Sequence, residues 1–217
     1  MKLCRLFGID VLIDSSWFLF VTILMFMESA QGGNALIMLG ILLLLFLGVL
    51  IHEYAHALTA RRLYGIQTRK IVLMMFGGAA FLDRMPWGGK EVVVGVVGPV
   101  SSFVLAGLAY PISLVFDPHG VVGAFAFLNF ILGAFNLLPV FPMDGGRMLR
   151  GALHACGVNI ILATQICLVV GLICVVTVFA IGLLSISVFT VIIFAIMMMA
   201  GFGELRMVKH ICKGERI

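Results

Sequence analysis

The sequence predicts an all-α polytopic membrane protein with about six transmembrane helices, because it is rich in apolar residues and poor in charged ones. Of its 217 residues, 63% are apolar and 11% are charged, whereas soluble domains carry about 25% charged residues. The 14 Lys and Arg and the 10 Asp and Glu are too sparse to cover a water-exposed surface or to form a basic stripe for nucleic acid. The composition therefore excludes an ordinary soluble domain and a nucleic-acid-binding protein, and it indicates that a lipid bilayer surrounds the chain.

Charged residues mark the ends of the predicted spans, because a helix needs about 20 apolar residues to cross the hydrocarbon core. The spans predicted within a single transmembrane domain over residues 1–217 are 15–29, 35–60, 92–116, 120–143 with a broken end, 159–182 and 186–203. The last two share one uncharged run, and their hairpin is predicted near Gly182 to Ser187. A signal peptide is the alternative for the first span, but Asp10 and Asp14 interrupt the region where a signal needs a basic start and an apolar core.

The basic residues predict the topology. With six crossings, one side of the membrane holds residues 1–14, 61–91, 144–150 and 204–217, and these segments contain all 14 Lys and Arg. Cytoplasmic loops carry an excess of basic residues. We therefore expect a multi-pass protein of a cell membrane with both termini in the cytoplasm.

The predicted second span contains His52-Glu53-Tyr54-Ala55-His56, an HExxH motif on a helix. Residues four apart lie on the same helix face, so both imidazoles can reach one Zn²⁺ ion. Ionisable residues within a span are costly unless they serve a function, which favours a metal site over a packing role or a chance motif. Because Arg61 marks the cytoplasmic end of this helix, we expect the site within the membrane near the cytoplasmic side.

A third protein ligand must come from another segment, because catalytic zinc takes three protein ligands and keeps one position for water. The candidates are His119, His154 and the acidic residues other than Glu53, most of which lie at the flanks of spans. Asp144 stands out because two prolines precede it and two glycines follow it, and a straight helix cannot run through such a segment. Broken backbone at membrane depth is tolerated where it lines a water-filled cavity. A simple surface turn at the end of the fourth span is the alternative.

The HExxH motif and the later segment Asn136-Leu137-Leu138-Pro139-Val140-Phe141-Pro142-Met143-Asp144-Gly145-Gly146 together resemble the site-2 protease family of intramembrane zinc metalloproteases, over nearly the whole chain. The likeness is to the compact archaeal and sporulation-type branch. The sequence contains neither PDZ nor CBS domains, so we expect either a minimal core or a shortened form of a longer protein. Many relatives carry an Asn after the Gly-Pro of the third span, whereas this chain has serine in Gly98-Pro99-Val100-Ser101-Ser102.

The resemblance implies one Zn²⁺ per chain, with His52, His56 and Asp144 as metal ligands and Glu53 as the catalytic residue. It implies regulated intramembrane proteolysis, in which a zinc-activated water hydrolyses a peptide bond within or near the transmembrane segment of a membrane-anchored protein substrate. Glu53 acts as general base in this scheme. Asn136 either donates to the developing oxyanion or positions the loop. The sequence identifies neither the physiological substrate nor a regulatory membrane partner.

Residues 71–83 are apolar but too short to span, and they are centred on two glycines. A substrate helix hides its peptide bonds in its own hydrogen bonds, so it must unwind locally and be received by another element. The resemblance implies a short membrane-associated β-hairpin here, between the second and third helices. Gly77, Gly78 and Ala79 would offer its edge to the substrate by strand addition. A re-entrant segment, an interfacial loop or a short helix is the alternative.

A membrane metal-ion or proton transporter is the alternative function, because it could also use buried His, Glu and Asp side chains. The ionisable groups of a transporter should be distributed along a path through the bilayer. Here the His-Glu-His cluster lies near one side, and the outer halves of the better-defined spans contain no ionisable residue. The distribution of charge therefore favours the protease.

Overall fold

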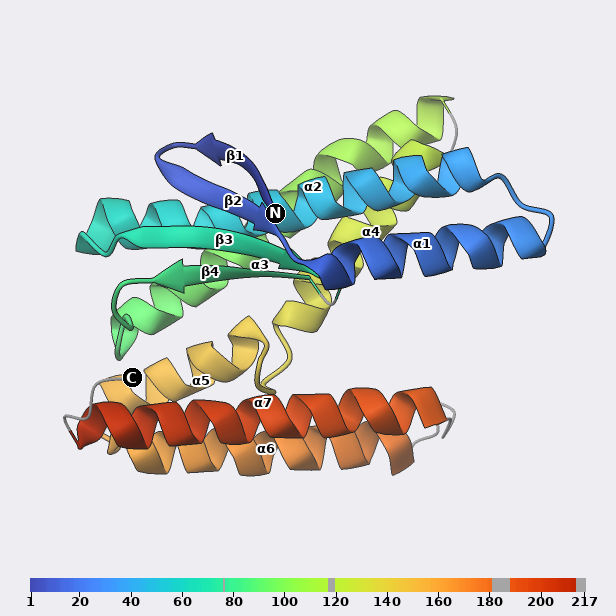
Figure 1. The fold of residues 1–217 in the computed structure, drawn as a ribbon. Helices are drawn as coiled ribbons and strands as arrows, with labels where there is room; N and C mark the ends of the chain where they lie inside the picture. The colour runs from blue at the N-terminus through green and yellow to red at the C-terminus, as the bar shows by residue number, and fades with distance from the viewer. Residues whose placement is uncertain (76, 117–119, 181–187, 214–217) are drawn as a thin grey trace. The chain divides into compact units, whose positions relative to one another are not determined.

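The computed structural model describes residues 1–75, 77–116, 120–180 and 188–213, and this part of the chain forms seven helices and four strands (Figure 1). In chain order they are β1 (Lys2–Leu6), β2 (Ile9–Ile13), α1 (Ser15–Ala30), α2 (Ala35–Tyr64), β3 (Thr68–Met74), β4 (Gly77–Leu82), α3 (Gly89–Phe116), α4 (Val121–Asn136), α5 (Asp144–Ala155), α6 (Ile160–Ala180) and α7 (Val188–Cys212). The chain forms two compact units, Met1–Met85 with Val97–Ala134, and Pro86–Val96 with Phe135–Ile217.

Three of the described helices are long and apolar enough to cross a membrane, namely α2, α3 and the first 18 residues of α6. Helices α1 and α4 are apolar but shorter, with 16 residues each. Each predicted span overlaps a described helix, and the bounds of the spans and the count of six crossings stay predictions. The hairpin predicted near Gly182 to Ser187 lies outside the described residues.

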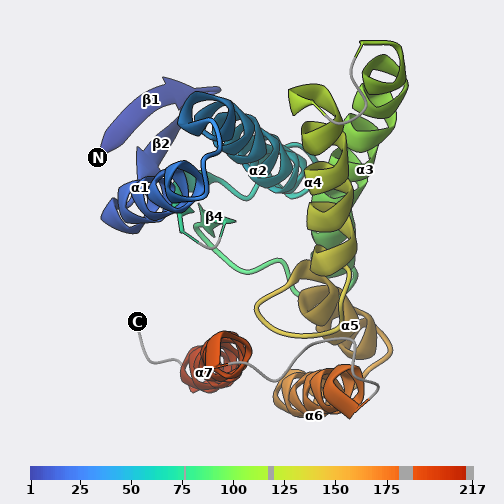
Figure 2. The same ribbon diagram turned by 90° about the vertical axis from the view of Figure 1, so that its right-hand side faces the viewer.

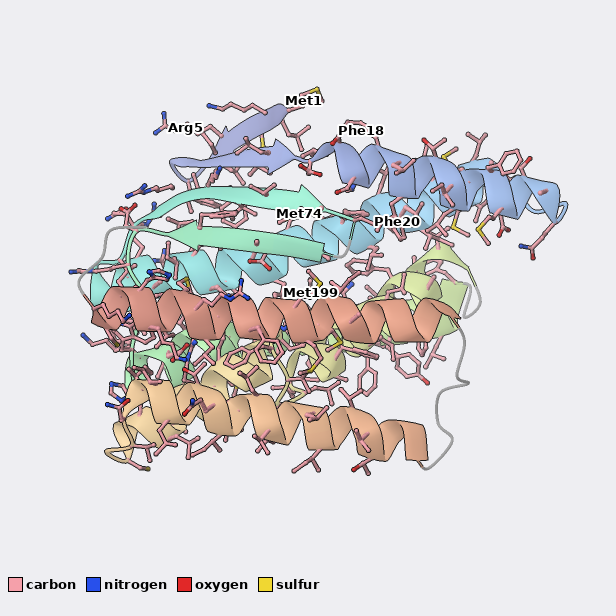
Figure 3. The ribbon with its side chains drawn as sticks, turned by 60° about the horizontal axis from the view of Figure 1, so that its bottom comes forward. Met1, Arg5, Phe18, Phe20, Met74 and Met199 are labelled. Carbon is pink, nitrogen blue, oxygen red and sulfur yellow. The ribbon has the colours of Figure 1, made fainter. Side chains whose placement is uncertain are left out.

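Large apolar side chains project outward from the helices, as a lipid environment requires. Figure 3 shows Phe18 on α1 and Met199 on α7, whose side chains are 44% and 72% exposed. Phe20, two residues after Phe18, instead packs edge to face against Phe46 of α2, with ring centroids 6.5 Å apart. The helix α1 therefore turns one side toward α2 and leaves another for lipid.

In the first unit, α1 and α2 pack side by side against a four-stranded sheet of order β1-β2-β3-β4 (Figures 1 and 2). The two outer pairs are antiparallel, and β2 pairs with β3 in parallel because α1 and α2 form the connection between them. The predicted hairpin between the second and third helices is thus present as β3 and β4. The all-α prediction was wrong in extent, because the sheet also includes an N-terminal hairpin that hydropathy did not reveal.

The N-terminal hairpin, β1 and β2, has apolar residues at alternate positions of β2 and a tight turn between the two strands. Ile9, Val11 and Ile13 of β2 are buried in the core shared with α1 and α2. Phe7 and Gly8 both have positive φ, 52° and 82°, as the two central residues of a type I′ hairpin turn require. The sequence did not predict this strand, because Asp10 and Asp14 give the segment charge. Its alternate residues are nevertheless apolar.

The hairpin is tied to the helix that carries the HExxH motif. The Tyr54 hydroxyl donates to the Leu6 carbonyl oxygen at 3.1 Å, and Arg61 donates to the Phe7 carbonyl oxygen at 2.7 Å. Tyr54 therefore uses the helix face that looks away from the histidines. These bonds help to define the rotation of α2 about its axis.

The second unit contains α5, α6 and α7, and the last two lie side by side (Figures 1 and 2). Its centre is Arg150 of α5, whose side chain is fully buried and pairs with Glu91 at the start of α3 and with Glu204 of α7. Arg147 also pairs with Glu204, at 2.9 Å. Removing one partner of a buried ion pair costs about 3–5 kcal/mol, so this cluster strongly constrains α5. Sequence analysis did not predict α5 as a helix.

Candidate metal centre

Helix α2 places His52 and His56 one turn apart on a buried face, with 2% and 8% of their surface exposed. Their ring centroids are 4.9 Å apart, in an edge-to-face arrangement. The helix is continuous over 30 residues, so the spacing of four residues in the motif becomes a fixed spatial relation. The prediction that the two imidazoles share one face is confirmed.

The two imidazoles point to one place on helix α3. A Cβ atom at Gly98 would lie 2.2 Å from Nε2 of His56 and 2.6 Å from Nε2 of His52. Both Nε2 atoms therefore converge next to a residue that has no side chain. Two neutral imidazole nitrogens on a common point are the donor set that Zn²⁺ prefers, and Gly98 provides the space beside them.

The other ring nitrogen of His52 contacts Ser102, which follows Gly98 by one turn of α3. Nδ1 of His52 lies 2.9 Å from Oγ of Ser102, and both side chains are buried. Ser102 belongs to the Gly98-Pro99-Val100-Ser101-Ser102 segment that stood out in the sequence. Sequence analysis left this position without a role, and the structure places it against a candidate ligand.

Glu53 follows His52 and faces strand β4. A Cβ atom at Gly78 would lie 2.7 Å from Cγ of Glu53 and 3.1 Å from Cγ1 of Val49. The strand therefore passes against α2 where Glu53 emerges, and this approach requires a glycine. β4 is an edge strand of its sheet, and among the described strands it pairs with β3 alone.

Asp144 lies in the second unit, at the first position of α5. Helix α4 ends at Asn136, and the following turns include a cis peptide bond at Phe141-Pro142. A Cβ atom at Gly145 would lie 2.2 Å from the carbonyl oxygen of Leu137, so the backbone folds tightly on itself. Helix α4 thus ends before the two prolines, within the predicted fourth span. A carboxylate in the first turn of a helix is also favoured by the helix dipole.

The predicted site residues thus fall into two groups. His52, Glu53, His56 and the Gly77, Gly78 and Ala79 stretch of β4 lie in the first unit, whereas Asn136 and Asp144 lie in the second. Gly98 and Ser102 were missed as site residues. The available signal was a Gly-Pro pair within an apolar span, but only the structure shows which side chains face it.

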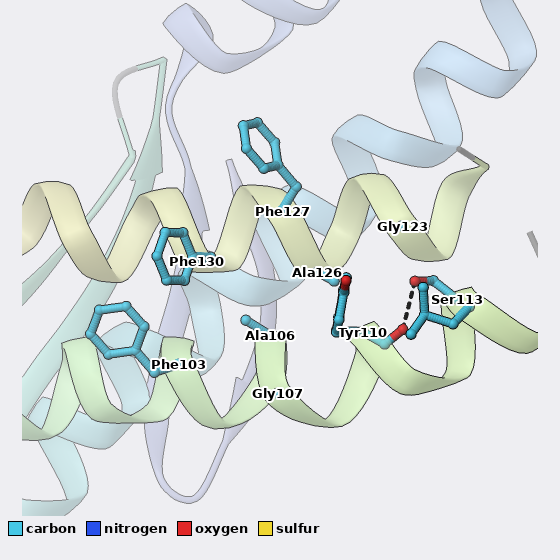
Figure 4. A pocket seen from close by; sticks show the side chains of 10 residues that line it. Phe103, Ala106, Gly107, Tyr110, Ser113, Gly123, Ala126, Phe127 and Phe130 are labelled. Carbon is cyan, nitrogen blue, oxygen red and sulfur yellow. Dashed lines mark hydrogen bonds between the residues drawn. The ribbon is translucent and has the colours of Figure 1, made fainter. Parts of the chain in front are cut away.

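An apolar groove in the first unit lies elsewhere, between α3 and α4 (Figure 4). It has a volume of about 710 Å³, and aromatic rings such as Phe103, Phe127 and Phe130 line it. Its polar lining groups are the hydroxyls of Tyr110 and Ser113, and Ser113 donates to the Tyr110 carbonyl oxygen at 2.7 Å. These groups are poor metal ligands, so the groove does not compete with the histidine pair as a metal centre.

Apolar helices that bury two histidines one turn apart, with a glutamate next in sequence, are the arrangement expected of a membrane metalloprotease. Comparisons with known proteins agree with this class. The family model of Peptidase family M50 matches residues 117–181. The solved structure of a site-2 protease from Methanocaldococcus jannaschii matches 94% of this chain and 94% of its own, with a TM-score of 0.73 and 27% identity.

Curated relatives point to the same family. Zinc metalloprotease MJ0392 of M. jannaschii is 33% identical over 157 residues, which are 70% of this chain and 45% of the relative. Stage IV sporulation protein FB of Bacillus subtilis is 33% identical over 113 residues, 50% of this chain and 38% of that protein. The chain therefore spans less than half the length of these curated relatives. Together these comparisons support the site-2 protease family of zinc metalloproteases, the family that the motifs of this chain resemble.

We expect Gly98→Ala to weaken zinc binding, because a methyl group there would overlap both imidazoles. Overpacking costs about 1–3 kcal/mol, which is roughly 5- to 150-fold in a dissociation constant. Competition with a chelator measures this constant. Gly107→Ala on the same helix is the control, because nothing lies within 4 Å of its Cβ position. Wild-type affinity in Gly98→Ala would contradict the placement of the histidines.

Proposed function

We propose that this chain is an intramembrane zinc metalloendopeptidase that hydrolyses a peptide bond within or near the transmembrane segment of a membrane-anchored protein, in regulated intramembrane proteolysis. The observation that carries this proposal is the convergence of the His52 and His56 Nε2 atoms at Gly98, next to Glu53 on an apolar helix. A buried donor set of this kind is expensive in a membrane unless a cation uses it. The curated relatives are named zinc metalloproteases, which supports zinc as that cation.

Asp144 is the proposed third ligand, with one Zn²⁺ per chain. Its motif position matches the family pattern, and it follows a broken segment of the kind that lines cavities at membrane depth. The competing candidate His154 is engaged locally, because its Nδ1 lies 2.9 Å from the Val158 carbonyl oxygen. His119 lies outside the described residues. A carboxylate also suits the dication, which compensates its charge.

Glu53 is the proposed proton carrier. Bound zinc would supply a Lewis acid that acidifies water and polarises the scissile carbonyl. The Glu53 carboxylate accepts a proton from the attacking water as the carbon–oxygen bond forms. It then delivers that proton to the leaving nitrogen as the carbon–nitrogen bond breaks. Asn136, at the end of α4, would donate to the oxyanion or hold the segment that precedes Asp144.

Strand β4 is the proposed receiver of the substrate. Its outer edge is open in the described sheet, and an extended peptide can add to such an edge through backbone hydrogen bonds. Gly78 brings this strand into contact with Glu53. A peptide held along Gly77, Gly78 and Ala79 would therefore be unwound and presented beside the general base.

The proposed location is a cell membrane, with both termini in the cytoplasm and the active site near the cytoplasmic side. The segregation of all 14 Lys and Arg to one set of segments supports this orientation. A membrane-anchored substrate would then release its product on that side. A separate regulatory partner in the membrane is compatible with the proposal, and we do not assign one.

Glu53→Gln should abolish proteolysis while leaving zinc bound, because Glu53 carries protons and does not ligate the metal. General acid–base groups contribute about 10²- to 10⁴-fold to rate, and we expect a loss in this range. The measurement compares cleaved single-span proteins in membranes that contain wild-type or Glu53→Gln protein, with zinc content determined in parallel. Glu28→Gln, at the end of α1, is the control. Cleavage at the wild-type rate in the Glu53→Gln protein would refute the proposed protease function. Metal transport by that variant would favour the transporter function.

Asp144→Asn should lower both zinc retention and proteolysis, because the amide keeps the shape of the side chain but loses the charge that binds the dication. We expect zinc to dissociate at chelator concentrations that the wild-type protein tolerates. Asp10→Asn is a matched control, since Asp10 lies on β2 and pairs with Lys2 at 2.8 Å. Full zinc content in Asp144→Asn under chelation would remove Asp144 from the site.

Gly78→Ala should slow proteolysis without changing zinc affinity. The added methyl group would lie 2.7 Å from Cγ of Glu53, so either the strand or the carboxylate must move. We expect roughly a 5- to 150-fold loss of rate, which corresponds to overpacking by about 1–3 kcal/mol. Cleavage rate and zinc affinity are measured on the same preparation. An unchanged cleavage rate would show that β4 and Glu53 do not cooperate.

A further inference from the structure

The hydrogen bond between His52 and Ser102 differs from those of the other serines described on α3. A serine within a helix ordinarily bonds a carbonyl oxygen of its own preceding turn. Ser101 does so, donating to Gly98 at 2.7 Å, and Ser113 donates to Tyr110 at 2.7 Å. Ser102 instead contacts Nδ1 of His52 on helix α2, at 2.9 Å.

This contact bears on which nitrogen of His52 can bind a metal. A neutral imidazole carries its proton on one nitrogen and a lone pair on the other, and the hydrogen bond of one nitrogen selects the tautomer. A proton on Nδ1 can be donated to the Ser102 oxygen. The lone pair is then on Nε2, the atom that converges with Nε2 of His56 at Gly98.

The burial of Ser102 and His52 strengthens the preference for one tautomer of His52. Ser102 is fully buried and His52 is 2% exposed, so bulk water cannot replace the hydroxyl as a partner. Gly98 and Ser102 are four residues apart and lie on the same face of α3. One side of α3 thus supplies the space for both Nε2 atoms and the acceptor for one Nδ1.

We propose that Ser102 is a positioning residue that holds the His52 ring in the orientation and tautomer required for a metal ligand. This inference rests on the proposed function, because it assumes that His52 binds zinc. Ser102 acts through His52 and touches neither substrate nor metal. Partners of this kind typically change metal affinity by about 10- to 100-fold when they are removed.

The test is the zinc dissociation constant of the full-length chain in detergent, measured by competition with a chelator. Ser102→Ala should bind zinc 10- to 100-fold more weakly than wild type, whereas Ser101→Ala and Ser113→Ala should bind it equally well. Ser102→Thr, which keeps the hydroxyl, should recover most of the affinity. Thermal unfolding of the zinc-free proteins provides the structural control, and we expect the same Tm for Ser102→Ala and Ser101→Ala.

A second readout observes the tautomer directly. In the zinc-free protein labelled with ¹⁵N-histidine, wild-type His52 should show a protonated Nδ1, and Ser102→Ala should show a mixture of tautomers. Wild-type zinc affinity in Ser102→Ala would overturn this inference and leave the proposed function intact. Equal losses of affinity in Ser101→Ala and Ser102→Ala would also overturn it. Failure of the wild-type chain to bind zinc would overturn the proposed function, and this inference with it.

Discussion

The first unit depends on a close approach between two apolar helices, one that carries two imidazoles and one that has a glycine opposite them. Any side chain at Gly98 would overlap the His52 and His56 rings. Burial of polar groups in an apolar environment is costly unless they have partners. Ser102 satisfies one nitrogen of His52, and a metal ion would use the Nε2 atoms. The packing of α2 against α3 therefore also sets the positions of the histidine nitrogens that would bind the metal.

Glycines also allow close contacts at other positions along α2. Gly48, one turn before His52, has no space for a Cβ because the buried Asn129 of α4 lies against it. Gly78 of β4 allows the strand to reach Glu53. In lipid, apolar burial does not drive helices together, so close backbone approach at small residues becomes the main source of packing energy. The glycines are therefore placed where α2 must contact another element.

The sequence was sufficient to predict those parts of the site that depend on local spacing. The HExxH pattern placed two histidines on one face because a helix repeats every 3.6 residues, and the prolines before Asp144 predicted that α4 would stop. Each of these two inferences needs only a short stretch of chain and one physical rule. The length of the apolar run over residues 71–83 predicted only that it does not span the membrane, whereas the hairpin now seen as β3 and β4 was implied by the family resemblance.

Contacts between distant residues were not predictable in this way. Ser102 and His52 are 50 residues apart, and no local pattern distinguishes Ser102 from Ser101 before the helices are packed. The parallel pairing of β2 with β3 encloses two helices, so its register depends on how these helices pack. The hydropathy pattern also did not reveal β1 and β2. Each strand has only five residues, and so short a strand contributes little to a hydropathy averaged over the length of a transmembrane span.

Two polar clusters among the described residues differ in whether their charges balance within the protein. In the second unit, Arg147 and Arg150 face Glu91 and Glu204, so positive and negative charges balance within the protein. Such a cluster restrains α3, α5 and α7, and it has no need of a ligand. The histidine cluster instead brings two imidazole nitrogens to one point, on the helix that also carries Glu53. Imidazole nitrogens that meet at one point are suited to bind a cation such as Zn²⁺, which is why this cluster, and not the larger ionic one, is the proposed catalytic centre.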